Sequence, residues 1–164
     1  MLADIFISYS RSDRDRVRLV AAALESAGFS TWWDSDLAGG VEYSREIEER
    51  INAARAVVVA WSATSIESTW VADEAELARD TGKLVPLALD ASQPKIGFRQ
   101  FQTIDFSNWN GDGRAPCFDA LTQALARFIE PRTDTTPGTT GPAADGDHFD
   151  FDAGSLQTTR PALA

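Results

Sequence analysis

An uninterrupted apolar run, AVVVAW, occupies residues 56–61. A strand that is apolar at every position needs cover on both of its faces, which is typical of a strand inside a parallel sheet. We therefore predict a buried central strand here. Similar runs lie on both sides of it along the chain, and helical periodicity fills much of the sequence between them.

This alternation continues over most of the chain. Four further strands are predicted, at residues 4–10, 29–33, 84–89 and 103–106. Helices are expected at residues 12–27, after the loop of residues 34–42, and at residues 64–81 and 117–129. The pattern predicts an α/β fold: a flavodoxin-like, doubly wound parallel five-stranded sheet of order 2-1-3-4-5, with helices on both faces.

Three local signals refine this prediction. Ser12-x-x-Asp15 and Thr64-x-x-Glu67 have the form of capping boxes, so we expect helices to begin there. Pro86 lies within the fourth strand and has no backbone N–H, which predicts an edge-like or irregular ladder at that point.

The composition changes after residue 130. Thr, Pro, Gly, Ala and Asp dominate residues 131–164, and such a segment buries too little apolar surface to offset its ordering entropy. We therefore predict one domain over residues 1–130, followed by a disordered acidic tail or linker over residues 131–164.

The bulk composition excludes several function classes. A net charge of −10 over 164 residues argues against nucleic acid or an anionic membrane as the main partner. Cys117 is the single cysteine and His148 the single histidine, which excludes an internal disulfide, a zinc cluster and a Ser-His or Cys-His pair. The sequence shows neither a signal peptide nor the ~20 apolar residues of a membrane helix, so a cytoplasmic location is expected.

A sheet of this type binds ligands beyond the carboxyl ends of its strands, where the strand order reverses. That point lies here between the first and third strands, so the segments at residues 10–12 and 62–65 are the ones to consider. Neither contains a Gly-x-Gly-x-x-Gly or Walker phosphate loop, which disfavours a conventional dinucleotide-binding or NTPase site.

The predicted helix at residues 64–81 carries one acidic residue on its apolar side. With ~100° per residue and Trp70 as the origin, Glu74 falls at about 40°, in the middle of an apolar arc. That arc is formed by Leu77, Ala78, Val71 and Ala75, whereas Asp73, Glu76 and Asp80 fall on the opposite side. An unpaired buried carboxylate is costly, so Glu74 should either be paired or face a cleft.

The residues alone leave both readings open. Glu74 is equally compatible with a structural salt bridge to an arginine such as Arg11 or Arg45 and with a functional role. Trp70 is either a core residue, which helical spacing favours, or a wall of a ligand site. Arg11 is either an anion contact or a solvated loop charge.

Five motifs follow one another along the chain. They are DIFISYS at residues 4–10, Trp32-Trp33-Asp34 with Leu37 and Gly39-Gly40, VVVAWS at residues 57–62, Ser68-x-Trp70-Val71-x-x-Glu74, and Phe106-Ser107-x-Trp109. Together they resemble the Toll/interleukin-1 receptor (TIR) domain family in its bacterial form, over about residues 3–130. TIR domains have the flavodoxin-like arrangement and signal by self-association. Many bacterial and plant members also cleave NAD+ between ribose and nicotinamide.

The resemblance implies a specific site. In the enzymes of the family, the glutamate four residues after the helical Trp is essential, and Glu74 has that position here. The implied substrate-binding residues are Tyr9, Ser10, Arg11, Asp34, Leu37 and Trp70. NAD+ is then the substrate, and neither a cofactor nor a metal is implied. The loop after the second strand often carries a Lys or Glu that closes over the ligand, whereas Ser35 and Ala38 stand nearby here.

Two functions follow from the resemblance. The first is an NAD+ glycohydrolase or cyclase in bacterial defence or virulence signalling, activated by self-association. The second is a non-enzymatic scaffold that binds other TIR domains, and other TIR proteins or a sensor subunit are the further partners it suggests. Scaffolding members generally lack the Trp-x-x-x-Glu glutamate, so Glu74 favours the enzyme. A response-regulator receiver needs an aspartate where Trp61-Ser62 stands, and is excluded.

Overall fold

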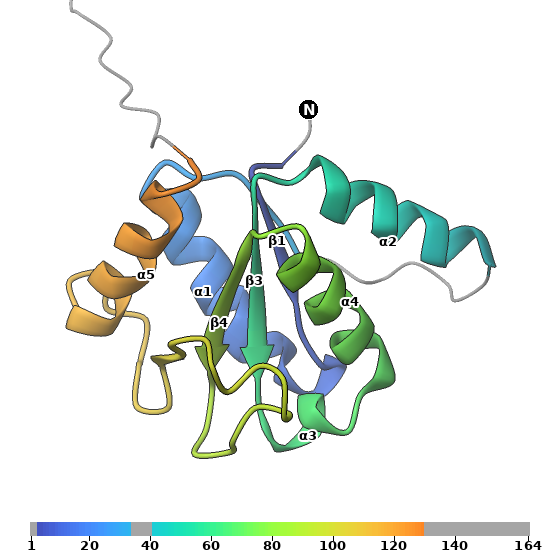
Figure 1. Cartoon of the computed structure of the whole chain (residues 1–164). Helices are drawn as coiled ribbons and strands as arrows, with labels where there is room; N and C mark the ends of the chain where they lie inside the picture. The colour runs from blue at the N-terminus through green and yellow to red at the C-terminus, as the bar shows by residue number, and fades with distance from the viewer. Residues whose placement is uncertain (1–2, 34–40, 130–164) are drawn as a thin grey trace, which may run out of the picture. The chain divides into compact units, whose positions relative to one another are not determined.

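Five parallel strands form one sheet in the order β2-β1-β3-β4-β5 (Figure 1). The computed structural model describes residues 3–33 and 41–129, so the predicted tail lies outside the described residues. The strands are β1 (Ile5–Ser8), β2 (Thr31–Trp32), β3 (Ala56–Trp61), β4 (Leu84–Ala88) and β5 (Ile104–Asp105). The predicted strand order is therefore confirmed, with β1 and β3 paired at the reversal point.

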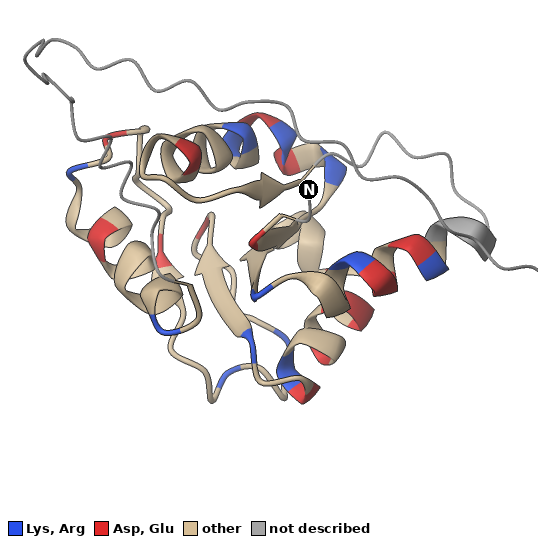
Figure 2. Cartoon of the chain, turned by 90° about the horizontal axis from the view of Figure 1, so that it is seen from above, with Lys and Arg blue, Asp and Glu red and all other residues tan. Residues whose placement is uncertain are grey.

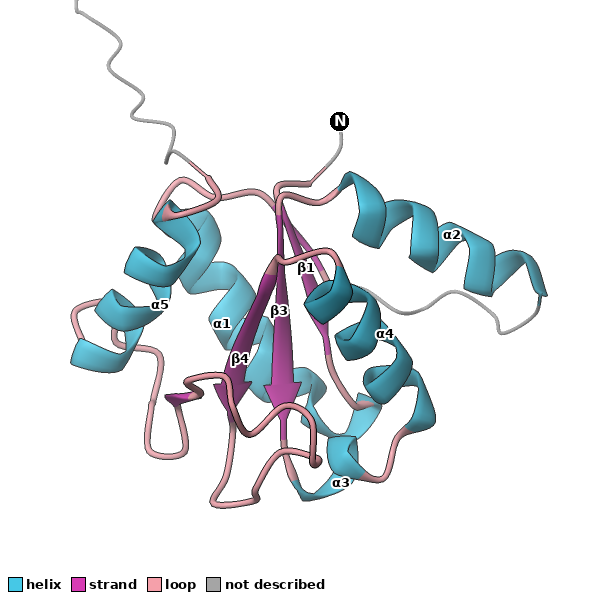
Figure 3. Cartoon of the chain, in the orientation of Figure 1, coloured by secondary structure: helices cyan, strands magenta, loops and turns pink. Residues whose placement is uncertain are grey.

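Helices cover both faces of this sheet (Figure 3). They are η1 (Arg11–Asp13), α1 (Arg14–Ser26), α2 (Val41–Ala53), α3 (Ala63–Ile66), α4 (Thr69–Asp80) and α5 (Pro116–Ala126). Buried residues of α1 and α5 join one core cluster, and those of α2 and α4 join the other. The doubly wound architecture is confirmed. None of the described helices combines the length and apolar character that crossing a bilayer requires.

The strand periodicity divides the core between these two faces. Ile5 and Ile7 of β1 pack with α1 and α5, whereas Phe6 between them packs with α2 and α4. All six residues of β3 are buried, as the run AVVVAW predicts. Because successive side chains alternate between faces, Ser8 lies on the same face as Phe6, beneath α4.

Both predicted capping boxes are wrong. The helical turn η1 begins at Arg11, and Asp13 occupies the N-cap of α1 without a side-chain capping bond. In the second case, Ser62 caps α3 by accepting from Ser65 N–H, and the chain then turns before Ser68 caps a separate helix, α4. The expected single helix over residues 64–81 is therefore two helices.

Pro86 lies where β4 has a neighbour on one side. β4 pairs with β3 from Leu84 to Ala88, but its pairing with the short β5 begins at Leu87. Pro86 therefore pairs with a strand on one side only, as the edge-like prediction requires.

Candidate active site

The carboxyl ends of β1 and β3 lie side by side, because Ser8 pairs with Val59. Side chains then link the segments that leave these strands. The Asp13 carboxylate accepts hydrogen bonds from Ser62 Oγ at 2.5 Å and from Thr64 Oγ1 at 3.2 Å. The two segments expected to face a ligand are therefore held together at the reversal point.

A second carboxylate fixes the exit of β4. Asp90 accepts hydrogen bonds from the backbone N–H groups of Ala63 and Ser92, both at 2.9 Å. Burial by itself raises the pKa of Asp90, but these hydrogen bonds and the nearby Arg16 guanidinium outweigh that effect and lower the pKa below its ordinary value. Asp90 is thus an ionised, fully engaged structural carboxylate.

Arg16 of α1 completes this edge of the sheet. Its guanidinium donates to the carbonyl of Leu89, to the carbonyl of Phe106 at 3.0 Å and to that of Ser107 at 3.2 Å. One side chain thereby joins α1 to the ends of β4 and β5, and it satisfies backbone acceptors that have no strand partner.

α4 directs a single carboxylate towards the sheet. Glu74 is half-buried, whereas the other acidic residues of this helix, Asp73, Glu76 and Asp80, are exposed. The angular argument from the sequence therefore separates the four carboxylates correctly. Glu74 reaches the sheet beside Ser8, the last residue of β1.

Burial raises the pKa of Glu74 to about 7, and the charge of Asp73 adds to the rise. The Ser8 hydroxyl faces this carboxyl closely enough to offset part of the effect. The two groups nevertheless stop short of full hydrogen-bonding geometry, since Ser8 Oγ is buried without a hydrogen-bond partner in the described part of the chain. Glu74 is thus a desolvated carboxyl with little compensation.

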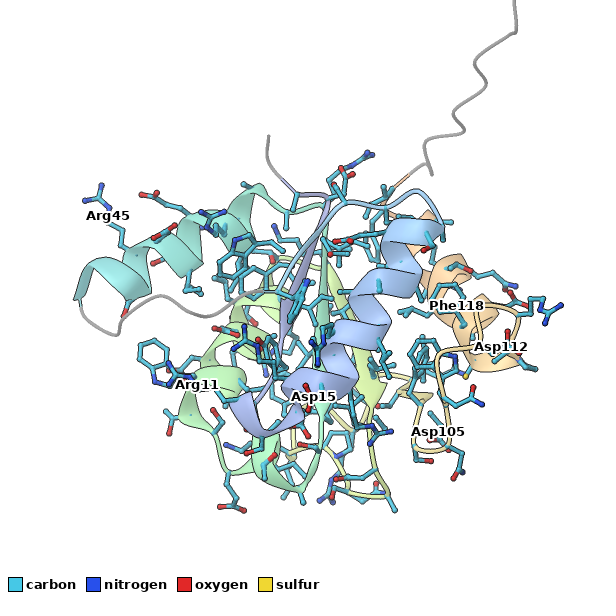
Figure 4. The ribbon with its side chains drawn as sticks, turned by 180° about the vertical axis from the view of Figure 1, so that it is seen from behind. Arg11, Asp15, Arg45, Asp105, Asp112 and Phe118 are labelled. Carbon is cyan, nitrogen blue, oxygen red and sulfur yellow. The ribbon has the colours of Figure 1, made fainter. Side chains whose placement is uncertain are left out.

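The arginine partners considered for Glu74 are placed elsewhere. Arg45 pairs with Glu49 at 3.2 Å and points away from the sheet at the end of α2 (Figure 4). Arg11 is exposed, and none of the ion pairs between described residues includes it or Glu74. Within residues 3–33 and 41–129, the salt-bridge explanation of Glu74 is therefore wrong.

Trp70 is a surface residue rather than a core residue. It is 51% exposed in the first turn of α4, one turn before Glu74. The helical spacing that favoured burial does not hold for this first-turn residue, since α4 begins at Thr69 and not earlier. Its position leaves the role of ligand wall as the remaining prediction.

The other predicted substrate-binding residues are placed differently from one another. Ser10 precedes η1 as its N-cap, and Arg11 begins that turn. The ring of Tyr9 packs against the α1 and α5 core, with its centroid 6.4 Å from that of Trp33. Tyr9 and Glu74 thus belong to opposite faces of the sheet. Asp34 and Leu37 lie outside the described residues.

Ser8 is the residue that sequence reasoning missed. It is 1% exposed and stands at the end of a strand whose other three residues are apolar. The sequence does contain a signal. Ser8 is two residues after Phe6, so both side chains face the same side of the sheet, and Ser8 pairs with the central strand β3. A polar residue at such a position requires an explanation that an apolar one does not.

A separate cavity of about 360 Å³ opens beyond β4 and β5. Its lining includes Asp90, Ser92, Arg99, Asp105 and Ser107, and no residue of α4 contributes to it. It is therefore unrelated to Glu74. In the part of the chain that the structure describes, no three His, Cys, Asp or Glu side chains are grouped to hold a metal ion.

Comparison with known protein families now has a geometric basis. The TIR domain profile matches residues 5–122, which is most of the chain. The chain belongs to the TIR domain family. This TIR domain has the expected sheet order, and its Glu74 lies at the carboxyl edge of the sheet on α4. A comparison with curated individual proteins finds no match.

Solved structures of TIR domains share the fold. The TIR domain of the Toll-related receptor TRR-2 from Hydra magnipapillata is 17% identical with a TM-score of 0.65, over 75% of this chain and 98% of that one. A TIR-STING receptor from C. gigas, solved with 2',3'-cGAMP, is 23% identical with a TM-score of 0.62, over 80% of this chain and 41% of that one. The TIR domains of the activated Roq1 resistosome are 20% identical with a TM-score of 0.55, over 75% and 99%. At these identities the likeness concerns the fold alone.

Proposed function

We propose that this TIR domain cleaves NAD+ between ribose and nicotinamide, with Glu74 as the catalytic carboxylate. The observation that carries the proposal is the uncompensated, half-buried carboxyl that α4 directs to the end of β1. Two other carboxylates at this edge, Asp13 and Asp90, are occupied by hydrogen bonds. Perturbed groups of this kind concentrate at functional sites.

The chemistry needs little more than such a group. Nicotinamide leaves as a neutral molecule from a positively charged ring, so no general acid has to protonate it. The ribose acquires oxocarbenium character as the bond breaks, and a carboxylate close to it stabilises the developing charge and holds the ribose hydroxyls. Water then adds to the anomeric carbon and releases a proton, which completes the hydrolysis. The positively charged nicotinamide ring, once bound, also favours the ionised form of the Glu74 carboxyl. It therefore lowers the pKa of Glu74 from the value near 7.

The test is to incubate the protein with NAD+ at several protein concentrations and to quantify nicotinamide release. TIR domains generally self-associate, and we expect the rate per molecule to rise with concentration. Glu74→Ala should abolish release. Glu76→Ala is the matched control, because it removes an exposed carboxylate from the opposite side of the same helix.

The alternative is a scaffold that binds other TIR domains without catalysis. It is supported if nicotinamide release is absent at every concentration, or if the Glu74→Ala and unmodified proteins release it equally. Binding to other TIR domains would then be measured directly. The substrate, product and partners named for this chain are proposed, because the solved relatives share only its fold.

A further inference from the structure

Ser8 presents a buried hydroxyl without a partner. It is 1% exposed, and its Oγ makes no hydrogen bond with any residue that the structure describes. Such a group loses its hydration without compensation, which destabilises the folded state. The three other residues of β1 are apolar, so an alanine would suit this position better if packing were the sole requirement.

Among the described residues, the Glu74 carboxyl faces the Ser8 hydroxyl closely enough to interact with it. α4 lies over this face of the sheet, and its Glu74 carboxyl is the polar group that faces Ser8. The elements packed against α4 offer no competing charge nearby: β1, β3, β4 and α3 contain no charged residue. On α2, Arg45 is paired with Glu49 and Arg50 with Glu46.

Asp73 and Asp13 have a defined effect or a defined partner. Asp73, on α4 itself, opposes ionisation of Glu74. Asp13, in the turn after β1, is engaged by Ser62 and Thr64. Figure 2 shows the acidic and basic residues of α2 distributed along that helix. The hydroxyl of Ser8 is therefore the group beside the Glu74 carboxyl that favours its ionised form.

We propose that Ser8 is a positioning residue for Glu74: its hydroxyl donates a hydrogen bond to the carboxylate when Glu74 ionises, and so fixes the orientation of that side chain. The proposal deepens the proposed function and rests on Glu74 as the catalytic carboxylate. A hydroxyl hydrogen rotates freely, so a small side-chain movement completes the bond. Bound to one oxygen, Ser8 leaves the other Glu74 oxygen for the substrate.

The strength of this hydrogen bond depends on the protonation state of Glu74. A neutral carboxyl is a weaker acceptor than a carboxylate, so the hydroxyl gains most when the proton leaves. Ionisation of Glu74 and completion of the bond are thereby coupled. Removing the hydroxyl should make the carboxylate harder to form, without disturbing the fold, because no existing bond is broken.

The experiment is a direct carbon-13 NMR titration of the Glu74 carboxyl in the full chain without NAD+. We expect Ser8→Ala to raise the pKa of Glu74 by about one unit. Ser8→Thr, which keeps the hydroxyl, should restore it. The matched control is Ser30→Ala, which removes a hydroxyl that donates to Asp4 at 2.7 Å at the other end of β1. That variant should leave the Glu74 titration unchanged.

The pH dependence of nicotinamide release supplies the second readout. In Ser8→Ala its acid limb should move to higher pH by the same amount, which a purely structural role of Ser8 would not produce. An unchanged Glu74 titration in Ser8→Ala, or an equal shift in Ser30→Ala, overturns the inference. A shifted titration in a protein that never releases nicotinamide supports the hydrogen bond and instead overturns the proposed hydrolase activity.

Discussion

Asp90 and Glu74 are two carboxylates at the same edge of one sheet, and their surroundings are opposite. Asp90 accepts two backbone hydrogen bonds at 2.9 Å, and its pKa is lowered. Glu74 is half-buried beside an unpartnered hydroxyl, and its pKa is raised to about 7. At the β4 exit the carboxylate is satisfied by hydrogen bonds, which favours stability. At the end of β1 the Glu74 carboxyl and the Ser8 hydroxyl lack such partners among the described residues, which is typical of functional sites.

The largest effect expected from this contrast is on activity. Glu74→Gln keeps the size and shape of the side chain but removes its charge, so nicotinamide release should fall on the order of 100-fold or more. Asp90→Asn makes the same change at the other carboxylate and should leave release within about twofold. Steady-state rates for the two variants provide the comparison. Equal losses would show that the two carboxylates do not differ in function.

The structural side of the comparison is tested by Arg16. Its guanidinium serves three backbone carbonyls, so Arg16→Ala should lower the free energy of unfolding by about 3 kcal/mol. Arg18→Ala is the matched control two residues later, since Arg18 pairs with Asp15 on the exposed surface. That change should stay within about 0.5 kcal/mol. Urea unfolding at pH 7 measures both. A small effect of Arg16→Ala would mean that the β4 and β5 exits are held by other contacts.

The sequence predicts part of this comparison. Helical periodicity separates Glu74 from Asp73, Glu76 and Asp80, because the apolar stripe of α4 is a local pattern. Strand order follows from alternation and general rules of handedness. These features depend on neighbours in the chain, and the structure confirms them.

Other features depend on partners distant in the sequence. Asp13 fails as a side-chain cap because its carboxylate binds Ser62 and Thr64, 49 and 51 positions away. The break between α3 and α4, by contrast, follows from local capping, since Ser62 and not Thr64 is the N-cap of α3. Trp70 is exposed in the first turn of α4, a helix that begins later than predicted. The unpaired state of Ser8 follows from the packing of α4, which no local pattern specifies.

The pH dependence of stability should differ between Glu74 and its amide variant. The pKa of Glu74 is raised above its unfolded value of 4.5, so the folded protein holds this proton more tightly than the unfolded chain. The resulting stability is present below pH 4.5 and is lost as the pH rises to about 7. Glu74→Gln removes that loss. At pH 8 it should be more stable than the unmodified protein by about 2 kcal/mol.

Thermal or urea unfolding between pH 4 and 8 measures this difference. Glu76→Gln provides the control, because it makes the same chemical change at an exposed carboxylate of the same helix. If Glu74→Gln is instead destabilised at pH 8, the carboxylate is stabilised by contacts that the described residues do not provide. The Glu74 carboxylate would then favour both activity and stability, and not activity alone.

The smallest effect is expected at Asp90, with the opposite sign. Its pKa is lowered, so its contribution is present above the unfolded value of 3.8 and is lost as the pH falls further. Asp90 is only half-buried, and screening by solvent should limit the difference between Asp90→Asn and the unmodified protein to about 0.5 kcal/mol. Unfolding measured from pH 3 to 6 should show the two proteins converging at the acid end. Because Glu74→Gln and Asp90→Asn make the same chemical change, opposite pH trends in the two variants would isolate the surroundings of each carboxylate as the cause.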